Sequence, residues 1–141
     1  MKTLAIIKPD AFGRGEAGEI LAQLEADGFR IAAARVVHLT RAQAEAFYAV
    51  HRERPFFQSL VDFMTSGPCM PLALERESAV ARLREVIGDT DPATAAEGTV
   101  RKRFAESKER NAIHGSDSPE NGVAEVAFFF ATGELVSTTQ A

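Results

Sequence analysis

The chain has 141 residues, a formal net charge of −4 and one cysteine, Cys69. This length favours a single domain over residues 1–141 with a sufficient core, and a lone cysteine excludes an internal disulfide. The acidic balance is not typical of nucleic-acid binding, and no apolar stretch reaches membrane-spanning length. With no signal peptide visible, we expect a cytoplasmic protein that binds neither a membrane nor a specific nucleic acid.

Apolar periodicity and turn residues divide the chain into strands and helices. Helix starts are marked by a capping box of Thr40 and Gln43, by Ser78, and by Ser118-Pro119. We predict strands at 3–7, 29–39, 69–74 and 112–114. We predict helices at 16–27, from 40 to about 51, from 55, at 78–87 and at 119–130. A loop is expected at 89–98, one helical turn within 99–110, and a tail from 133. This order predicts an α+β sandwich in which helices pack on a four-stranded sheet.

The last helix is expected to bury one apolar face. A period of 3.6 residues places four side chains on that face. They are Val123, Val126, Ala127 and Phe130.

A glycine-rich segment at residues 13–18, GRGEAG, fits the dinucleotide-binding pattern G-x-G-x-x-G. That site also needs a tight turn from strand to glycine and an acidic residue at the end of the next strand. Here residues 9–12 intervene and the second predicted strand ends in Val37-His38-Leu39, so we do not expect dinucleotide binding. The sequence has neither a P-loop nor a metal-ligand spacing of His and Cys, so any metal should arrive with the substrate.

His114 is the strongest candidate for chemistry. It lies between a predicted strand and a predicted helix, and Gly115 follows it, where a ligand can approach closely. A neutral imidazole can act as a nucleophile when a carboxylate on its other ring nitrogen fixes the tautomer. Glu125, on the last helix, can supply that carboxylate. A lone histidine is more often a satisfied core residue, but these neighbours favour the catalytic interpretation.

Positively charged residues stand at the ends of several predicted elements. Phosphoryl transfer needs such charge around the moving group, and Lys8, Arg84 and Arg101 can supply it. Phe56 can offer a ring face to a base. Taken singly, each has a commoner structural explanation, because isolated charged residues are mostly just exposed and aromatic rings mostly pack in cores.

The segment from Asn111 to Ser118, NAIHGSDS, resembles the signature of the nucleoside diphosphate kinases. The similarity runs almost end to end, through IKPD at 7–10, GEI at 18–20, Tyr48, RPFF at 54–57, SGP at 66–68, GDTDP at 88–92 and GTVR at 98–101. The resemblance implies a ferredoxin-like α+β sandwich with a four-stranded antiparallel sheet. It also implies a ping-pong reaction, in which His114 takes the γ-phosphate of a nucleoside triphosphate as phosphohistidine and passes it to a nucleoside diphosphate.

The resemblance further implies a role for each matching residue. Glu125 would bond the far ring nitrogen of His114, and Ser116 would support Glu125. Phe56 would stack on the base, while Lys8 and Asn111 would hold the ribose hydroxyl. Residues expected to contact phosphates or lie beside the histidine are Lys8, Tyr48, Arg84, Thr90 and Arg101. Mg²⁺ would be held by the nucleotide phosphates without a direct protein ligand, and Asp117 would reach it through water at most.

The sequence departs from the family pattern at three places. Ala11 stands where the family usually has glycine, and Lys102-Arg103 replace Gly-Asp, which should make the rim of the site more basic. Pro71 removes a hydrogen-bond donor from a predicted inner strand, so we expect a bulge or local rearrangement there. Family members assemble partly through their chain ends, so we expect a homo-oligomer.

A non-catalytic ferredoxin-like module that binds nucleotides or RNA is the alternative. Its basis is the predicted sheet topology together with the basic run Arg101-Lys102-Arg103. The sequence lacks the basic strand with interleaved aromatic residues that stacks RNA bases. Salt-dependent RNA binding without phosphotransfer would favour this alternative.

Overall fold

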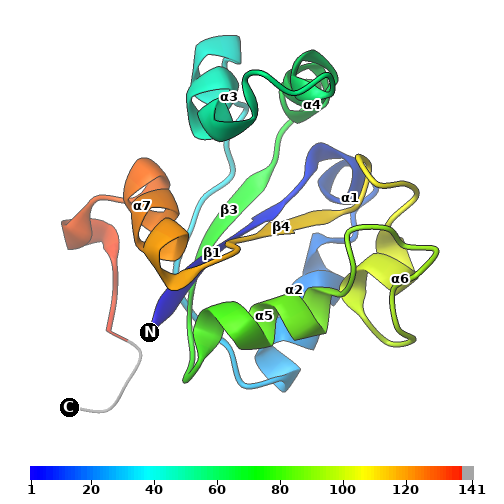
Figure 1. Cartoon of the computed structure of the whole chain (residues 1–141). Coiled ribbons are helices and arrows are strands. Elements are labelled where there is room, and N and C mark those ends of the chain that lie inside the picture. The colour runs from blue at the N-terminus through cyan, green and yellow to red at the C-terminus, as the bar shows by residue number, and fades with distance from the viewer. Residues whose placement is uncertain (138–141) are drawn as a thin grey trace.

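The structure is a computed structural model, and it describes residues 1–137 (Figure 1). Its centre is an antiparallel sheet with the strand order β2-β3-β1-β4. The strands are β1 (Lys2–Ile7), β2 (Arg30–Ala34), β3 (Met70–Glu75) and β4 (Ile113–Gly115). The helices are α1 (Pro9–Gly13), α2 (Ala17–Ala26), α3 (Arg41–Phe47), α4 (Phe57–Met64), α5 (Ala79–Ile87), α6 (Val100–Phe104) and α7 (Pro119–Phe129), with short 3-10 turns at Ala49–His51 and Thr132–Glu134. The predicted α+β, ferredoxin-like sandwich is confirmed.

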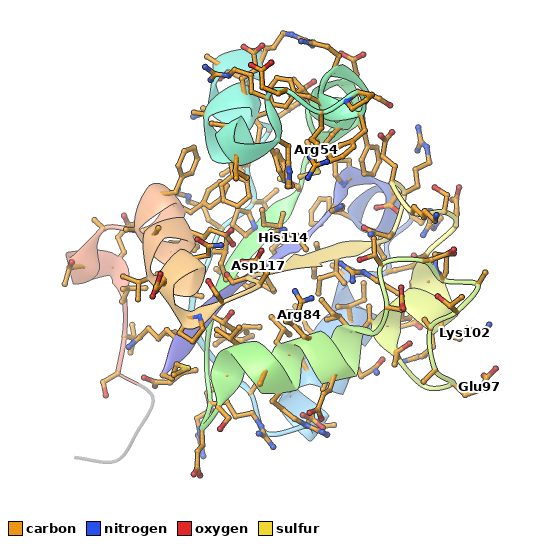
Figure 2. The ribbon with its side chains drawn as sticks, viewed as in Figure 1. Arg54, Arg84, Glu97, Lys102, His114 and Asp117 are labelled. Carbon is orange, nitrogen blue, oxygen red and sulfur yellow. The ribbon has the colours of Figure 1, made fainter. Side chains whose placement is uncertain are left out.

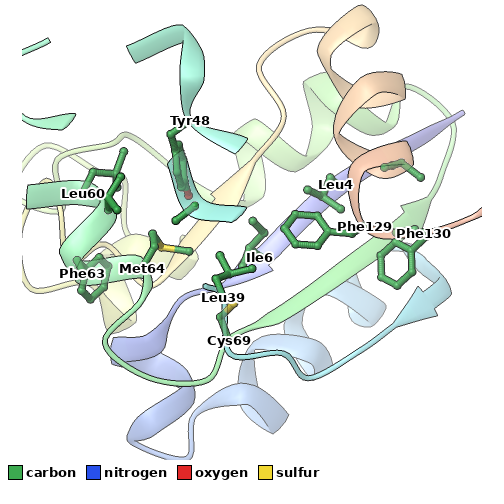
Figure 3. Close-up of a cluster of buried hydrophobic side chains, with 14 of the residues drawn as sticks. Leu4, Ile6, Leu39, Tyr48, Leu60, Phe63, Met64, Cys69, Phe129 and Phe130 are labelled. Atoms are coloured by element: carbon green, nitrogen blue, oxygen red, sulfur yellow. The ribbon is translucent and has the colours of Figure 1, made fainter. Parts of the chain in front are cut away.

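The sheet is buried on both faces, with α3, α4 and α7 on one side and α2 and α5 on the other (Figure 1). Along β1, Leu4 and Ile6 pack into the first cluster, whereas Ala5 and Ile7 pack into the second. Figure 3 shows the first cluster, where Leu4 and Ile6 lie among side chains of α4 and α7. Each such large side chain contributes about 1.5–3 kcal/mol when buried, so β1 anchors both layers.

Several helix ends follow the predicted signals. The Thr40 hydroxyl accepts from Gln43 N and the Gln43 side chain accepts from Thr40 N, so the predicted capping box is confirmed. The Ser118 side chain likewise accepts from Asn121 N at the start of α7. Ser78 differs from the prediction: it adopts φ 52°, and in the described chain its side chain makes no capping hydrogen bond.

Three elements differ from the sequence prediction. The helix predicted from 40 to about 51 is divided into α3, which ends at Phe47, and the 3-10 turn Ala49–His51. Helix α1 was not predicted; it begins with Pro9 directly after β1, because proline is suited to the first helical position. The predicted strand at 29–39 is shorter, since β2 ends at Ala34 and only an isolated bridge from Val37 to Cys69 continues it in the described part of the chain.

The buried face of α7 is rotated from the predicted one. Val123 is 72% exposed and Ala127 is also exposed, whereas Val126 and Phe130 are buried as predicted and Phe129 is buried in addition. Gly122 is also on the buried face, where an added Cβ would be in ordinary contact with Lys2 O at 3.5 Å. The apolar period alone therefore does not give the orientation of this helix against β1.

Pro71 lies in a regular ladder, so the predicted bulge at this residue is wrong. It pairs with Ile6 without a register shift, and its carbonyl accepts from Arg35 N at 3.2 Å. In an antiparallel ladder the nitrogen and oxygen of a residue face the same neighbour. The Pro71 nitrogen therefore faces the side of β2, beyond the end of that strand at Ala34. The register shift of this sheet lies instead between Ile31 and Ala33.

The end of the described chain is tied to the edge of the sheet. Val136 N donates to Ala32 O at 3.0 Å, and the Arg35 guanidinium donates to Phe129 O at 2.5 Å. Within residues 1–137, none of the helices is both long and apolar enough to cross a membrane. Residues 138–141 of the predicted tail lie outside the described residues.

Candidate active site

One cleft of about 1020 Å³ brings together segments that are distant in the sequence. Its walls come from the end of β1, the segment between α3 and α4, the end of α5 with the loop after it, α6, and the start of β4. Figure 2 shows His114 between the α3–α4 side and Arg84, which points from α5 toward it. The sequence-predicted residues that line the cleft are Lys8, Tyr48, Phe56, Arg84, Thr90, Arg101, Asn111 and His114.

The His114 ring is held by a carboxylate on the side away from the cleft. Its Nε2 lies 2.7 Å from Glu125 Oε1. The Ser116 hydroxyl donates to the same oxygen at 2.8 Å and accepts from Leu4 N at 3.2 Å, so β1 fixes this chain of contacts. An ionised Glu125 keeps the proton on Nε2 and leaves the lone pair on Nδ1. The arrangement predicted for Glu125 and Ser116 is thus present.

Two aromatic rings limit how the imidazole can turn. Phe47 packs edge-on against His114 with ring centroids 5.4 Å apart, and the Tyr48 ring centroid lies 6.3 Å from that of His114.

Gly115 lets α5 approach β4, since an added Cβ would lie 2.9 Å from Ile87 Cδ1. A larger residue at position 115 would therefore collide with side chains of α5.

Lys8 is buried beside other cations. Its Nζ donates to Asn111 Oδ1 at 2.8 Å. Burial, followed by the charge of Arg101, lowers the pKa of Lys8 from 10.5 to about 8. Burial and the charge of Arg84 likewise lower the pKa of Arg101 to about 10. An anion entering the cleft would offset this unfavourable concentration of positive charge.

Two polar groups at the cleft lack a protein partner. Among residues 1–137, the Tyr48 hydroxyl and Arg101 Nε are buried without a hydrogen-bond partner. Burial raises the pKa of Tyr48, so its hydroxyl stays protonated and can donate. The other Arg101 nitrogens donate to Gly88 O and Ile113 O, each at 2.9 Å. A buried polar group left unpaired is costly, which is consistent with donors reserved for a ligand.

A strained turn precedes the histidine. Ala112 has φ 72°, and Ile113 N donates across it to Asn111 O at 2.8 Å, which is a γ-turn. The Asn111 amide donates to Lys108 O at 3.0 Å and to Thr90 O at 3.4 Å. Strained backbone of this kind is concentrated at functional sites.

The comparisons with known proteins agree with one another. The family model for nucleoside diphosphate kinases matches residues 1–135. The chain is 57% identical to a nucleoside diphosphate kinase of Chlorobium chlorochromatii over 135 residues, which is 96% of each chain. It is 50% identical to one of Salinibacter ruber over 138 residues, 98% of this chain and 97% of the relative.

Two solved structures support the same assignment. A nucleoside diphosphate kinase of Aquifex aeolicus superposes with a TM-score of 0.93 at 46% identity, covering 96% of this chain and 98% of that one. A halophilic nucleoside diphosphate kinase of Halobacterium salinarum in complex with CDP gives 0.94 at 34% identity, covering 99% and 93%. The chain belongs to the nucleoside diphosphate kinase family. It is therefore a phosphotransferase, and the predicted family is confirmed.

Not every residue expected from the family pattern reaches the cleft. Asp117 accepts from Asn121 Nδ2 at 2.5 Å and is absent from the cleft lining described here. Lys102 donates to Pro92 O at 3.4 Å, and Arg103 donates to Gln23 Oε1, both also away from that lining. The more basic rim expected from Lys102 and Arg103 stays a prediction, because both side chains are exposed on α6 beside Arg101 but neither lines the cleft.

Other residues at or near the cleft were given no role from the sequence. His51 lines the cleft and its ring lies 5.3 Å from that of Phe56. Lys108 and Glu109 also line it. Arg54 projects from the segment before α4, on the opposite side of His114 from Arg84 (Figure 2). Arg54 is the first residue of the RPFF segment, in which only Phe56 was given a role, and the one sequence signal for His51 is its closeness to that segment.

Proposed function

We propose that His114 is the phosphate carrier of a ping-pong transfer between nucleotides. The Nδ1 lone pair attacks the γ-phosphorus of a nucleoside triphosphate, the bond to the β–γ bridging oxygen breaks, and the diphosphate leaves. A terminal oxygen of a second nucleoside diphosphate then attacks the phosphohistidine, and Nδ1 recovers its lone pair. The observation that carries this proposal is the 2.7 Å contact of Nε2 with Glu125, which keeps the proton on Nε2 in both steps.

The cations of the cleft bind and orient the phosphates in this proposal. Lys8, Arg84 and Arg101 provide the positive charge, and arginine can make forked contacts to phosphate oxygens. The Tyr48 hydroxyl and Thr90 complete the set of donors. Support comes from the lowered pKa values of Lys8 and Arg101. Repulsion from neighbouring cations contributes to both shifts, and a bound polyanion would relieve it.

The nucleoside occupies the outer part of the same cleft. Phe56 is 46% exposed, although it is a large apolar ring, so it can stack on a base without reading its edges. Asn111 and Lys8, already bonded to each other, can hold the ribose hydroxyl. Binding through a ring face predicts weak selectivity among bases. The CDP complex of the Halobacterium salinarum relative supports a nucleotide in this fold.

The nucleotide is proposed to enter as its Mg²⁺ complex. Within residues 1–137, no group of three or more His, Cys, Asp or Glu side chains is arranged to hold a metal. The phosphates would therefore carry the ion, which neutralises part of their charge. The contact of Asp117 with Asn121 leaves it at most a water-mediated role.

Phosphorylation of the protein tests this function directly. Incubation with γ-labelled ATP and Mg²⁺ should give an acid-labile, base-stable phosphoprotein, from which a nucleoside diphosphate removes the label. His114→Ala should abolish both labelling and turnover. His38→Ala is the matched control, because His38 is exposed and bonds Thr65 O away from the cleft. Full exchange activity in His114→Ala would overturn the assignment.

We also propose a cytoplasmic homo-oligomer. Exposed apolar side chains, including Val36, Val123 and Phe128, offer surface for self-association, and light scattering measures the assembly. Cys69 is a free, buried thiol, which suits a reducing compartment.

A further inference from the structure

Asp10 is a buried carboxylate beneath the active-site cleft. It lies in α1, two residues after Lys8, and only 6% of it is exposed. Its Oδ2 accepts from Ala112 N at 3.1 Å. Its Oδ1 is buried and, within residues 1–137, has no hydrogen-bond partner. A buried carboxylate with one unpaired oxygen is expensive for the fold, so its presence calls for a functional reason.

The hydrogen bond of Asp10 holds the strained turn before the histidine. Ala112 has φ 72°, a conformation that costs a non-glycine residue about 1–2 kcal/mol. Both of its peptide groups are fixed from the same segment, since Asp10 accepts its N–H and Lys8 N donates to its carbonyl at 2.8 Å. Asn111 precedes this turn and His114 follows it by two residues. The segment from Lys8 to Asp10 therefore sets the position of both.

The charge of Asp10 acts on Lys8. Burial disfavours the protonated form of Lys8, and so does the positive charge of Arg101 on α6. Asp10 on α1 and Glu109 in the loop before β4 oppose this effect, and Asp10 is the stronger of the two. Asn111, also from that loop, accepts from Lys8 Nζ at 2.8 Å and carries no charge.

We propose that Asp10 is a positioning residue of the phosphotransfer site, which holds the Ala112 turn through one oxygen and keeps Lys8 charged through its negative charge. The inference rests on the proposed function of His114 and the cleft. It assigns Asp10 no contact with the substrate. Its two effects are separable, because one needs the acceptor oxygen and the other needs the charge.

Two substitutions separate these effects. Asp10→Asn keeps an acceptor for Ala112 N and removes the charge, so Lys8 should titrate about one pH unit lower. The alkaline limb of the kcat/KM profile should move by the same amount, giving up to about tenfold lower kcat/KM at pH 8. Asp10→Glu keeps the charge and displaces the oxygen, so it should lower kcat about 10- to 100-fold with Lys8 titrating as in the wild type.

Direct NMR titration of the Lys8 ε-carbon gives a readout that does not depend on activity. Lys8→Arg assigns the resonance, and Asp62→Asn is the matched control, because Asp62 is exposed and pairs with Arg41 outside the cleft. Circular dichroism tests whether each variant folds. If Asp10→Asn does not fold, Asp10→Glu carries the test alone, and full kcat in that variant overturns the proposal.

The outcomes distinguish this inference from the function on which it rests. If the wild type forms no phosphohistidine, the proposed function fails, whatever the Lys8 titration shows. If the wild type is phosphorylated and Lys8 titrates unchanged in a folded Asp10→Asn, the inference fails and the proposed function stands.

Discussion

Lys8→Met should make the protein more stable while it removes activity. Lys8 is only 6% exposed, and burial together with Arg101 lowers its pKa from 10.5 to about 8. At pH 7 the folded protein must therefore keep a buried ammonium charged beside another cation. Methionine has a similar unbranched shape and carries no charge, so it removes this unfavourable interaction.

The size of the effect follows from the pKa difference. Each pH unit corresponds to about 1.4 kcal/mol, so the difference between 10.5 and about 8 corresponds to about 3 kcal/mol of destabilisation at pH 7. The variant also loses the hydrogen bond from Lys8 Nζ to Asn111 Oδ1, which is worth about 1 kcal/mol. The expected net gain in the free energy of unfolding is about 2 kcal/mol at pH 7.

The pH dependence has a definite sign. Between pH 8 and 10.5 the unfolded wild type holds a proton on Lys8 that the folded protein has lost, so wild-type stability rises relative to the variant. The cost of burying the charged Lys8 is fully present below pH 8. The gain in unfolding free energy from Lys8→Met should therefore shrink as the pH rises from 8 to 10.5. Lys102→Met is the matched control on an exposed lysine and should change stability by less than about 0.5 kcal/mol.

Urea unfolding at several pH values and one protein concentration measures the difference. A constant concentration is needed because an oligomer changes its apparent stability with concentration. If Lys8→Met is less stable than the wild type at pH 7, or if the difference does not vary between pH 7 and 10, the electrostatic reasoning is wrong.

Three further substitutions test the contacts of the site. Glu125→Gln should lower kcat about 100-fold with little change in KM, because an amide no longer fixes the proton on Nε2 of His114; unchanged steady-state kinetics would contradict this. Phe56→Ala should raise KM about tenfold for purine and pyrimidine nucleotides alike, since the ring face is lost; an unaltered KM would argue against stacking. Gly88→Ala should destabilise the fold by about 2 kcal/mol in urea unfolding, because Gly88 has φ 89° and the added Cβ would lie 2.6 Å from Thr99 Oγ1. Gly13→Ala, at an open position, should be nearly neutral, and equal effects at the two glycines would refute this explanation.

Much of the site could be predicted from residues at the ends of elements. His114 lies where a predicted strand gives way to a helix, and Lys8 lies where β1 ends. These positions follow from apolar runs and capping residues, which are local signals. Glu125 could be proposed because a nucleophilic histidine needs a carboxylate, whereas the role of Thr90 came from the family resemblance, because a threonine in a predicted loop carries no local signal of function.

Other features depend on long-range packing that periodicity does not report. Helix α7 buries Gly122, Val126 and Phe129, so Val123 turns outward although the apolar period places it in the core. Pro71 is accommodated because its nitrogen lies beyond the end of β2, and that end could not be located from the sequence. Asp10 stands in the IKPD segment, but its role could not be read from the sequence, since its partner Ala112 is far along the chain.

Several departures from ordinary protein chemistry lie at the cleft or in the segments beside it. Tyr48 Oη and Arg101 Nε lack hydrogen-bond partners among the described residues, Asp10 leaves one oxygen unpaired, and Ala112 adopts a strained turn. Each feature destabilises the folded chain, and local propensity would not predict any of them. A site that must bind a triphosphate and release a diphosphate benefits from donors and charges whose missing partner is the ligand itself. Under the proposed function, phosphate oxygens that fill the cleft would pair with Tyr48 and Arg101 and offset the charge of Lys8, so binding of the substrate should stabilise the folded protein.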